Sequence, residues 1–559
     1  MEKKWWKEAV VYQIYPRSYN DTTGNGLGDL SGIIEKLDYI QSLGVTMIWI
    51  CPVYVSPNDD NGYDISDYRK ISVDFGGNET FDLLLKNIHS RGLKLIMDLV
   101  VNHTSDEHFW FQEAKKSKSN PYHDYYIWKE GDKGFPPNNW QSVFNGSTWK
   151  WNTATEEYFF HLYTQKQPDL NWENPIVREE IYAILDFWLA KGVDGFRMDV
   201  ISLISKRQEF DDVSETLSFI DVMEKVYANG PRVHEFLKEM NRKVLSNYDV
   251  VIVGEGPGVN LVHGPRYVAA KEKELNMIFH FDHLTIDFGP EGKYDPIPLD
   301  LVRFKTIFRE WDEALAADGW NSIFLGNHDF SRIVSRFGND KEYHVQSAKL
   351  LITLLMTLRG TPYVYQGDEI GMTNIAHASI EDYDDIESQN AWQDALVNGK
   401  NMNVFLRAVH CQSRDNARTP MQWDQSKNGG FSSGNPWIPI NENYKKINVA
   451  VQENESESIL HYYRKLIAFR KENVTLVYGN YEDLAPQDPN MFFYKRWDDT
   501  NEFVVVHNFS SIQQEFTNYV DNSFSLLMSN YMHKQSDQLN PWESRVYFRK
   551  LKKSHLIKN

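Results

Sequence analysis

The feature that most constrains the fold of this chain is a repeated alternation of apolar, strand-like runs with helix-like stretches. Eight runs have the length and residue types of β-strands, and they cover residues 10–17, 45–53, 93–101, 194–200, 250–253, 277–281, 321–325 and 362–365. Helix-like stretches lie between several of them, at 33–43, 81–91 and 177–190. Because helices alternate with the strands and eight strands close a barrel, the pattern predicts an α/β fold with a parallel (β/α)8 TIM barrel.

Two segments interrupt this alternation. Residues 104–173 are rich in Trp, Tyr, Phe, Asn and Pro and show no long helix, which indicates a small domain inserted after the third strand. After residue 478 the runs are short and alternating, as in an antiparallel β-sandwich. We therefore predict a catalytic barrel in two parts (1–103 and 174–479), an inserted B domain (104–173) and a C-terminal β-sandwich domain (480–559). Residues 370–435 read as a long irregular segment.

The composition excludes several classes of function. The chain has 559 residues, a formal net charge of −19 and no basic cluster, which argues against a nucleic-acid partner. No stretch is long and apolar enough to span a bilayer, and no apolar signal segment follows the first residues. Two cysteines, Cys51 and Cys411, form no disulfide framework and no CxxC metal site. We expect a cytoplasmic, monomeric protein without a membrane partner.

Charged residues end several of the predicted strands. The fourth strand ends in Arg197-x-Asp199, so that the arginine and the carboxylate lie on one face of the strand. The guanidinium favours the ionised carboxylate, which is then available as a nucleophile. From these two residues alone, a structural ion pair that caps the strand explains the pattern equally well.

The other strand ends distinguish these alternatives. The carboxyl ends of barrel strands meet at one face, and this chain places His103, Glu255, His328 and Asp329 there, after strands three, five and seven. Like charges placed together raise at least one carboxyl pKa, which separates a proton donor from an anion. A glycosidase needs this pair, with the two carboxyl groups ~5–5.5 Å apart if the anomeric configuration is retained.

A loop rich in Asp, Asn, Thr and Gly, residues 21–29, follows the first strand. Oxygen-bearing side chains at alternate positions are typical of loops that bind a hard cation such as Ca²⁺. On spacing alone, a plain Gly/Asp/Asn turn explains the loop better.

Several blocks of the sequence resemble motifs of the α-amylase superfamily, glycoside hydrolase family 13, and they lie at 98–103, 167–171, 195–199, 254–255 and 327–329. The resemblance extends over the whole chain, including the inserted domain and the C-terminal sandwich. Within the family, residues 58–63, 194–200 and 414–423 (RDNARTPMQW) are most similar to the branch of oligo-1,6-glucosidase, dextran glucosidase and sucrose isomerase.

The resemblance implies roles for individual residues. It implies Asp199 as nucleophile, Glu255 as general acid/base and Asp329 as the residue that binds the sugar's 2- and 3-hydroxyls, while Arg197 orients Asp199. It also implies a closed pocket for the terminal glucose, and hence an exo-acting enzyme, with Asp60, Tyr63, His103, Gln167, His328 and Arg414 as binding residues. Phe144 and Tyr163 either pack on the sugar face or belong to the core of the insert, and the sequence leaves both readings open.

The residue after the nucleophile bears on linkage. In this branch a valine there accompanies α-1,6 linkages, and this chain has Val200. The resemblance therefore implies a retaining α-glucosidase that releases α-glucose from the non-reducing end of isomaltose- and panose-type oligosaccharides through a covalent glucosyl-Asp intermediate. The alternatives are a sucrose isomerase (isomaltulose or trehalulose synthase), or an α-glucosidase that acts on α-1,4 linkages or sucrose with transglucosylation.

The chain also departs from the family pattern. Residues 282–287 lack the arginines of sucrose isomerases, although 384–387, 392–394 and 482–489 are similar to isomerase sequences. Gly256 follows the acid/base residue, and Phe330-Ser331 stands where Gln-Pro or Asn-Pro is usual, so we expect an altered leaving-group subsite. No cofactor is expected for catalysis. The resemblance implies a structural Ca²⁺, and its predicted ligands are Asp21, Thr23, Asn25, Leu27 and Asp29, of which threonine is a weak one.

Overall fold

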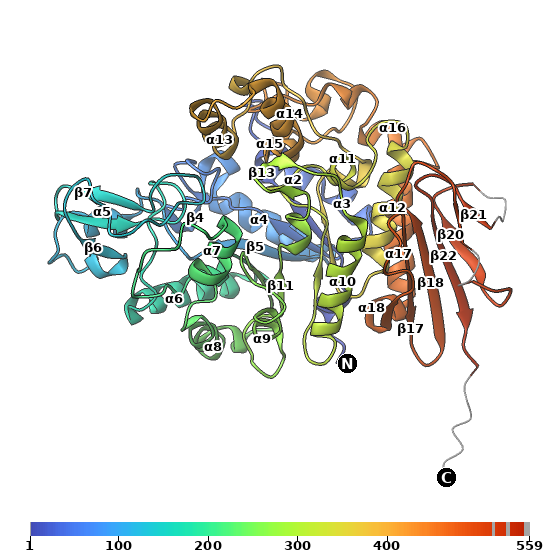
Figure 1. Ribbon diagram of the computed structural model, residues 1–559, viewed down its shortest axis with the longest axis horizontal. Helices are drawn as coiled ribbons and strands as arrows, with labels where there is room; N and C mark the ends of the chain where they lie inside the picture. The colour runs from blue at the N-terminus through green and yellow to red at the C-terminus, as the bar shows by residue number, and fades with distance from the viewer. Residues whose placement is uncertain (1, 517–519, 533–536, 553–559) are drawn as a thin grey trace, which may run out of the picture.

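A sheet of eight parallel strands forms the centre of the protein, as the computed structural model of residues 2–516, 520–532 and 537–552 shows (Figure 1). Its order is β11-β10-β9-β5-β2-β1-β15-β14. The two outer strands meet, because the Ser322 hydroxyl of β14 donates a hydrogen bond to the Ile278 carbonyl of β11 at 2.7 Å. The predicted barrel is therefore confirmed, and its strands are β1 (Val11–Ile14), β2 (Met47–Ile50), β5 (Lys94–Val100), β9 (Gly195–Asp199), β10 (Val251–Glu255), β11 (Met277–Phe279), β14 (Ser322–Ile323) and β15 (Thr361–Tyr365).

Helices surround this barrel, and the long ones are α4 (Gly77–Ser90), α6 (Pro175–Lys191), α8 (Val233–Lys243), α10 (Leu301–Leu315), α12 (His344–Thr357) and α17 (Ile459–Glu472) (Figure 1). The helix predicted at 33–43 is in fact two helices, α2 (Leu30–Glu35) and α3 (Leu37–Ser42), because the backbone of Lys36 leaves helical geometry at ψ 4°. The shorter helices are α1 (Trp5–Glu8), α5 (Phe109–Ala114), α7 (Phe219–Val222), α9 (Gly264–Val268), α11 (Ile333–Phe337), α15 (Asp415–Arg418), α16 (Val449–Glu453) and α18 (Val474–Tyr478).

The irregular segment predicted at 370–435 is wrong in its middle. Two helices occupy it, α13 (Ile386–Val397) and α14 (Met402–Gln412), and they lie together at one edge of the molecule in Figure 1. The physical reason is that α13 buries only Ser388 and Ala395. A helix with so little buried apolar surface lacks the periodic apolar stripe by which an amphipathic helix is recognised.

Two small β structures lie at opposite ends of the barrel (Figure 1). The segment after β5 forms an antiparallel sheet, β6 (Trp128–Glu130), β8 (Glu157–Phe160) and β7 (Trp149–Asn152). The C-terminal antiparallel sheet has the order β16 (Asn480–Asp483), β17 (Met491–Trp497), β18 (Asn501–Asn508), β22 (Ser544–Lys550) and β20 (Ser525–Ser529), beside a ladder of β19 (Gln514–Glu515) and β21 (Gln538–Leu539). Two further ladders pair β3 (Tyr54–Val55) with β4 (Asp67–Ile71) and β12 (Phe288–Gly289) with β13 (Gly292–Pro296). The exact domain boundaries stay predictions.

The close approach of β9 and β10 positions the charged residues at their ends. Gly195 has a φ of 151°, and a Cβ at this position would lie 1.9 Å from the Val251 carbonyl oxygen. The absence of a side chain therefore allows the two strands to pair. In the resulting register Arg197 lies beside Asp98 of β5 and Val253 of β10, and its guanidinium reaches the carboxylates of Asp98 and of Glu255, two residues beyond Val253.

Candidate active site

The centre of the site is one arginine that binds three carboxylates. The Nη1 atom of Arg197 lies 2.6 Å from an oxygen of Asp98 and 2.6 Å from an oxygen of Asp199. Its Nη2 atom lies 2.8 Å from Glu255. Arg197 is 1% exposed, so this group carries more buried negative than positive charge. A simple ion pair that caps a strand does not describe it.

This charge balance shifts the proton affinity of Asp199 and Glu255. Burial is the largest cause and raises the pKa of Asp199 well above its usual value, and the neighbouring carboxylates raise it further against the opposing effect of Arg197. Burial also raises the pKa of Glu255, although Arg197 and the Val200 N–H, which donates to Glu255 at 3.0 Å, oppose the shift. Because the two carboxyls share one guanidinium, they titrate as a pair, in which one member holds a proton while the other is an anion.

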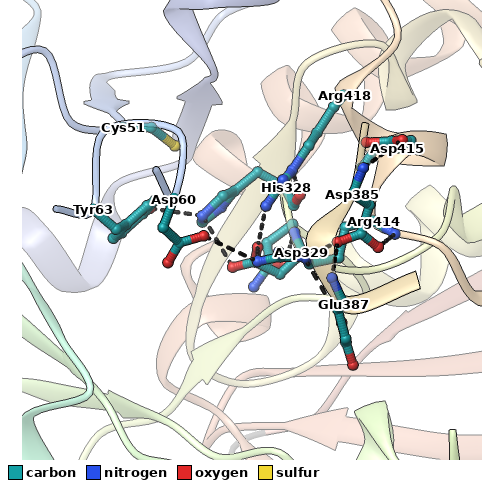
Figure 2. Close-up of polar contacts among 12 residues, drawn as sticks. Cys51, Asp60, Tyr63, His328, Asp329, Asp385, Glu387, Arg414, Asp415 and Arg418 are labelled. Carbon is teal, nitrogen blue, oxygen red and sulfur yellow. Dashed lines mark hydrogen bonds and ion pairs between the residues drawn. The ribbon is translucent and has the colours of Figure 1, made fainter. Parts of the chain in front are cut away.

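A second cluster surrounds Asp329 (Figure 2). Its carboxylate lies 2.8 Å from Arg418 and 3.0 Å from the Nε2 atom of His328. The Tyr63 hydroxyl lies 2.6 Å from the same nitrogen. Although burial opposes both charges, the attraction between the two groups raises the pKa of His328 to about 10 and lowers that of Asp329 well below its usual value. Asp329 is therefore a fixed anion.

Arg414 connects this cluster to the loop that follows β3 (Figure 2). Its guanidinium lies 3.6 Å from Asp60, 3.6 Å from Asp329 and 2.8 Å from Asp385. It also lies 5.0 Å from the centre of the Phe144 ring. The inserted segment, the barrel and the region of α13 thus meet at one guanidinium.

One cavity of about 930 Å³ joins the two clusters. Its lining includes ten of the predicted residues, namely Asp60, Tyr63, His103, Phe144, Tyr163, Asp199, Val200, Glu255, Asp329 and Arg414. Three more lie directly behind this wall. Arg197 binds Asp199, His328 binds Asp329, and the Gln167 amide donates to Asp60 at 3.1 Å. The structure therefore brings the predicted catalytic and sugar-binding residues together.

Phe144 and Tyr163 lie at the boundary of the cavity and the insert. Their rings meet edge to face with centroids 5.6 Å apart, and Tyr163 also lies 5.2 Å from the ring of His103. Tyr163 packs against the apolar cluster of the inserted segment as well. Phe144 and Tyr163 both line the cavity, and Tyr163 also packs in the insert, while their packing on a sugar face stays a prediction.

Val200 has an unusual backbone conformation. Its φ is 36°, in the left-handed region, which a β-branched residue rarely adopts. Its N–H donates to Glu255, while the preceding residue is Asp199. Such strain persists where the surroundings enforce it, and it occurs often at functional sites. Here the side chain of Val200 lines the cavity together with Asp199 and Glu255.

Sequence reasoning missed three charged residues of the site. Asp98 is the single charged residue of the buried run 95–100 of β5, and this is a signal, because a buried charge needs a partner. Arg418 follows Arg414 by four residues, a spacing that places two side chains on one side of a helical turn. Asp385 carries no comparable signal, because it precedes a helix that the sequence does not reveal.

The loop of residues 21–29 does not fit Ca²⁺ in this arrangement. Burial alone would raise the pKa of Asp21, but hydrogen bonds from Ser432 and from backbone N–H groups lower it. Its oxygens accept the N–H groups of Thr23, Gly24 and Gly26 at 2.8–2.9 Å. The Asn25 side-chain oxygen accepts the Leu27 N–H, and the oxygens of Asp29 accept donors from Thr22 and Gly32.

Ca²⁺ requires six to eight oxygen ligands that point at the ion. The side-chain oxygens of this loop point at hydrogen-bond donors instead. Within the described parts of the chain, no group of three or more His, Cys, Asp or Glu side chains offers another metal site. The Ca²⁺ that the resemblance implies therefore does not fit these residues as they are arranged, and no reaction step depends on it. No helix among the described residues is long and apolar enough to cross a membrane.

Known proteins are similar to this chain over nearly its whole length. The family described as "Alpha amylase, catalytic domain" matches residues 13–479. An oligo-1,6-glucosidase of Parageobacillus thermoglucosidasius is 51% identical over 557 residues, which cover 98% of this chain and 99% of the relative. A trehalose-6-phosphate hydrolase of Bacillus subtilis (strain 168) is 45% identical over 555 residues, which cover 97% and 98%. The crystal structure of an isomaltulose synthase from Klebsiella sp. LX3 matches with a TM-score of 0.95 and 42% identity, over 98% of this chain and 100% of that one.

Proposed function

The chain belongs to the alpha-amylase family and is a glycoside hydrolase, and from that premise we propose that it is a retaining, exo-acting α-glucosidase. Its proposed substrates are short α-1,6-linked gluco-oligosaccharides of the isomaltose and panose type. It releases α-glucose from their non-reducing ends. The likeness to oligo-1,6-glucosidases, at 51% and 49% identity, supports this choice of substrate.

The observation that carries the proposal is a set of unused polar atoms at one end of the cavity. Asp60 Oδ1 and Arg414 Nη2 belong to residues that line the cavity, and both atoms are buried and make no hydrogen bond to any described residue. Buried polar atoms normally have partners. An acceptor beside a donor suits a sugar hydroxyl, which both donates and accepts. Because Asp60 and Arg414 lie 3.6 Å apart, they close this end of the cavity, and a closed end accepts a chain terminus.

In the first chemical step, Asp199 attacks the anomeric carbon while Glu255 donates its proton to the glycosidic oxygen. The carbon–oxygen bond breaks, the leaving sugar departs with that proton, and a glucosyl ester forms on Asp199. Arg197 binds both carboxylates and keeps them close. This favours the shorter separation of ~5–5.5 Å, at which the second carboxylate acts as the nucleophile.

In the second step, the Glu255 carboxylate takes a proton from water, and the water oxygen attacks the same carbon. Asp199 leaves as a carboxylate, and α-glucose is released with its configuration retained. Asp329 remains an anion throughout, because Arg418 and His328 hold its carboxylate. Its charge-assisted hydrogen bonds to the 2- and 3-hydroxyls stabilise the oxocarbenium-like transition state.

The α-1,6 preference is assigned to the wall beside the nucleophile. Val200 presents an isopropyl group to the cavity next to Asp199 and Glu255. A branched side chain there narrows the approach of a leaving sugar that is attached through a secondary oxygen. A sugar attached through its CH₂ group lies farther away and passes more easily.

The test of the function is the product profile of the purified protein with isomaltose, maltose and sucrose in separate reactions. Rapid release of glucose from isomaltose with slow attack on maltose would support the proposal. Equal or faster hydrolysis of maltose, with transfer products, would make the protein an α-1,4-active glucosidase instead.

A second candidate is sucrose isomerisation, which the TM-score of 0.95 to an isomaltulose synthase favours. The leaving-group side of the cavity contains Phe281 and Phe330, whose rings meet edge to face with centroids 5.9 Å apart. A fructose retained there would attack the glucosyl-enzyme in place of water. Isomaltulose or trehalulose as main products from sucrose, with little free glucose, would support this candidate. The monomeric state and the cytoplasmic location stay predictions.

A further inference from the structure

We propose that Lys206 is a positioning residue that determines which ring nitrogen of His103 carries the proton, and thereby aims an N–H donor at the bound sugar. Lys206 lines no part of the cavity and has no place in the two chemical steps. The inference rests on the proposed function only in taking a sugar as the ligand of His103.

The ammonium of Lys206 is buried and fully used. Lys206 is 4% exposed and follows the turn after β9. Its Nζ lies 2.8 Å from Asp169 Oδ2, donates to Asn102 Oδ1 at 2.7 Å and donates to the Leu203 carbonyl. A lysine ammonium has three hydrogen atoms to donate, and here each has an oxygen acceptor. The side chain is therefore held in one position by oxygens from the barrel and from the inserted segment.

This charge pair sets the orientation of the Asn102 amide. The amide oxygen faces the Lys206 ammonium, so the amide nitrogen faces the other way and donates to Asp169 Oδ2 at 2.8 Å. Exchanging the two atoms would place NH₂ against an ammonium and an oxygen against a carboxylate. Both contacts would become repulsive. The two charges thus leave the amide a single favourable orientation.

The oriented amide fixes the tautomer of His103. Its nitrogen lies 3.2 Å from His103 Nδ1, and because an amide nitrogen only donates, this contact favours Nδ1 as the acceptor. The Tyr63 carbonyl, 3.2 Å from Nε2, favours the proton on Nε2 as well, whereas the Gln167 amide nitrogen, also 3.2 Å from Nε2, opposes it. Burial lowers the pKa of His103 to about 4, so the ring is neutral at neutral pH. A neutral ring has one proton, and with Nδ1 as acceptor this proton lies on Nε2.

The Nε2 atom of His103 points toward the closed end of the cavity. It lies 3.2 Å from the Tyr63 carbonyl and 3.2 Å from the Gln167 amide nitrogen, which itself donates to Asp60. A sugar oxygen that enters here meets two N–H donors. If the Asn102 amide turned over, its oxygen would favour the proton on Nδ1, and Nε2 would become an acceptor that faces the Tyr63 carbonyl.

The test compares variants by their dependence on single hydroxyls of the substrate. Lys206→Met removes the ammonium at similar length, and the double variant Lys206→Met/Asp169→Asn removes both charges if the single variant does not fold. The matched control is Lys305→Met. Lys305 is also a buried lysine, and its Nζ donates to the backbone carbonyls of Ala485, Asp488 and Met491, away from the cavity.

The assay is kcat/KM for p-nitrophenyl α-glucoside and its four monodeoxy analogues, with His103→Ala to identify the hydroxyl that this ring binds. In the wild type, loss of that hydroxyl is expected to lower kcat/KM about tenfold. In Lys206→Met, the loss of kcat/KM on removal of that hydroxyl should be as small as in His103→Ala. The losses on removal of the other three hydroxyls should stay as in the wild type, and Lys305→Met should match the wild type at all four. An equal loss on every substrate, with the penalty retained, would overturn the proposal.

A second measurement does not depend on activity. Nitrogen-15 NMR of histidine-labelled protein, assigned by the signals that His103→Ala removes, reports the tautomer directly. We expect the proton on Nε2 in the wild type and on Nδ1, or shared, in the Lys206 variant. If the wild type cleaves α-glucosides and the Lys206 variant keeps the proton on Nε2 of His103, the inference is overturned. A changed tautomer in a protein that does not cleave α-glucosides would instead refute the proposed function and leave the inference intact.

Discussion

Replacement of Arg197 by glutamine should move the pH profile of the enzyme toward alkaline pH. The guanidinium is the cation bound to Asp98, Asp199 and Glu255, and it lowers the pKa of both Asp199 and Glu255 against the effect of burial. Without it, Asp199 ionises only at higher pH, and Glu255 holds its proton to higher pH. The nucleophile must be ionised and the acid must be protonated. Both the acid limb and the alkaline limb of the pH profile of kcat/KM should therefore shift to higher pH.

The size of the shift follows from the geometry. Opposite charges ~4 Å apart interact by about 4 kcal/mol at the effective dielectric constant of about 20 that describes protein sites, which corresponds to roughly three pKa units. Arginine beside an aspartate lowers its pKa by about one to three units in known proteins. We therefore expect the acid limb to shift to higher pH by about one to three units. At a fixed pH on that limb, kcat/KM should then fall about 10- to 1000-fold.

The assay is kcat/KM for p-nitrophenyl α-glucoside between pH 4 and pH 9, with circular dichroism at each pH to confirm that the variant is folded. Arg197→Lys is the matched control, because it keeps a positive charge but cannot bind three carboxylates with a planar fork. Its shift should be smaller than that of Arg197→Gln. A uniform loss of kcat/KM with both limbs at the wild-type pH would refute the reasoning, because it would mean that the guanidinium only holds the shape of the site.

Further predictions concern chemistry, linkage, metal and acid stability. Asp199→Ala and Glu255→Gln should each lower kcat by several orders of magnitude with an unchanged circular dichroism spectrum, and near-wild-type turnover of either variant would exclude its assigned role. Val200→Thr should raise the ratio of kcat/KM on maltose to that on isomaltose, and an unchanged ratio would remove this residue as the selector. Chelation by EDTA should leave the Tm unchanged, since the oxygens of the loop after β1 already accept hydrogen bonds; a Tm that falls with EDTA and recovers with Ca²⁺ would contradict this. Burial lowers the pKa of His280 well below its usual value and that of His283 to about 3. Only the unfolded chain takes up their protons below about pH 6.5, so the free energy of unfolding should fall by about 1.4 kcal/mol per pH unit per histidine on acidification. In urea denaturation at pH 6 and pH 5, His280→Gln should reduce the fall in the free energy of unfolding between the two pH values by the contribution of one histidine. An unchanged fall would contradict the assignment.

The barrel could be predicted from the sequence because each of its strands is a short apolar run, which is a local signal. Each of the eight predicted runs overlaps an observed strand, and Asp199, Glu255 and Asp329, which lie at or after the ends of three of them, line one cavity. The helices between the strands were less accessible. Lys36 breaks the first predicted helix without glycine or proline, and α13 exposes most of its surface. Neither feature changes the local periodicity on which such predictions depend.

Only part of the site could be predicted from the sequence. A charged residue at the end of a strand can be recognised locally, but the residue that it contacts in the fold cannot. Asp199 and Glu255 could be identified in this way, but the arginine that binds both of them also binds Asp98 on a third strand. That contact depends on the register of β5 against β9, which no single stretch of sequence contains. The contact of Asp385 with Arg414 was still harder to predict, because Asp385 lies in a segment without an amphipathic periodicity.

The same reasoning explains why the inserted segment belongs to the catalytic apparatus. Asp169 comes from the insert, pairs with Lys206 of the barrel and accepts from Asn102, while the neighbouring Gln167 donates to Asp60. Removing one partner of the Lys206–Asp169 pair while the insert stays docked would leave a buried charge unpaired, which typically costs about 3–5 kcal/mol. The docking of the insert and the polarity of the sugar-binding end are therefore one energetic unit. A variant that weakens the Lys206–Asp169 pair should lower the stability of the docked insert and alter the donor at His103 together, whereas one that only lowers the stability of the C-terminal sheet should change neither.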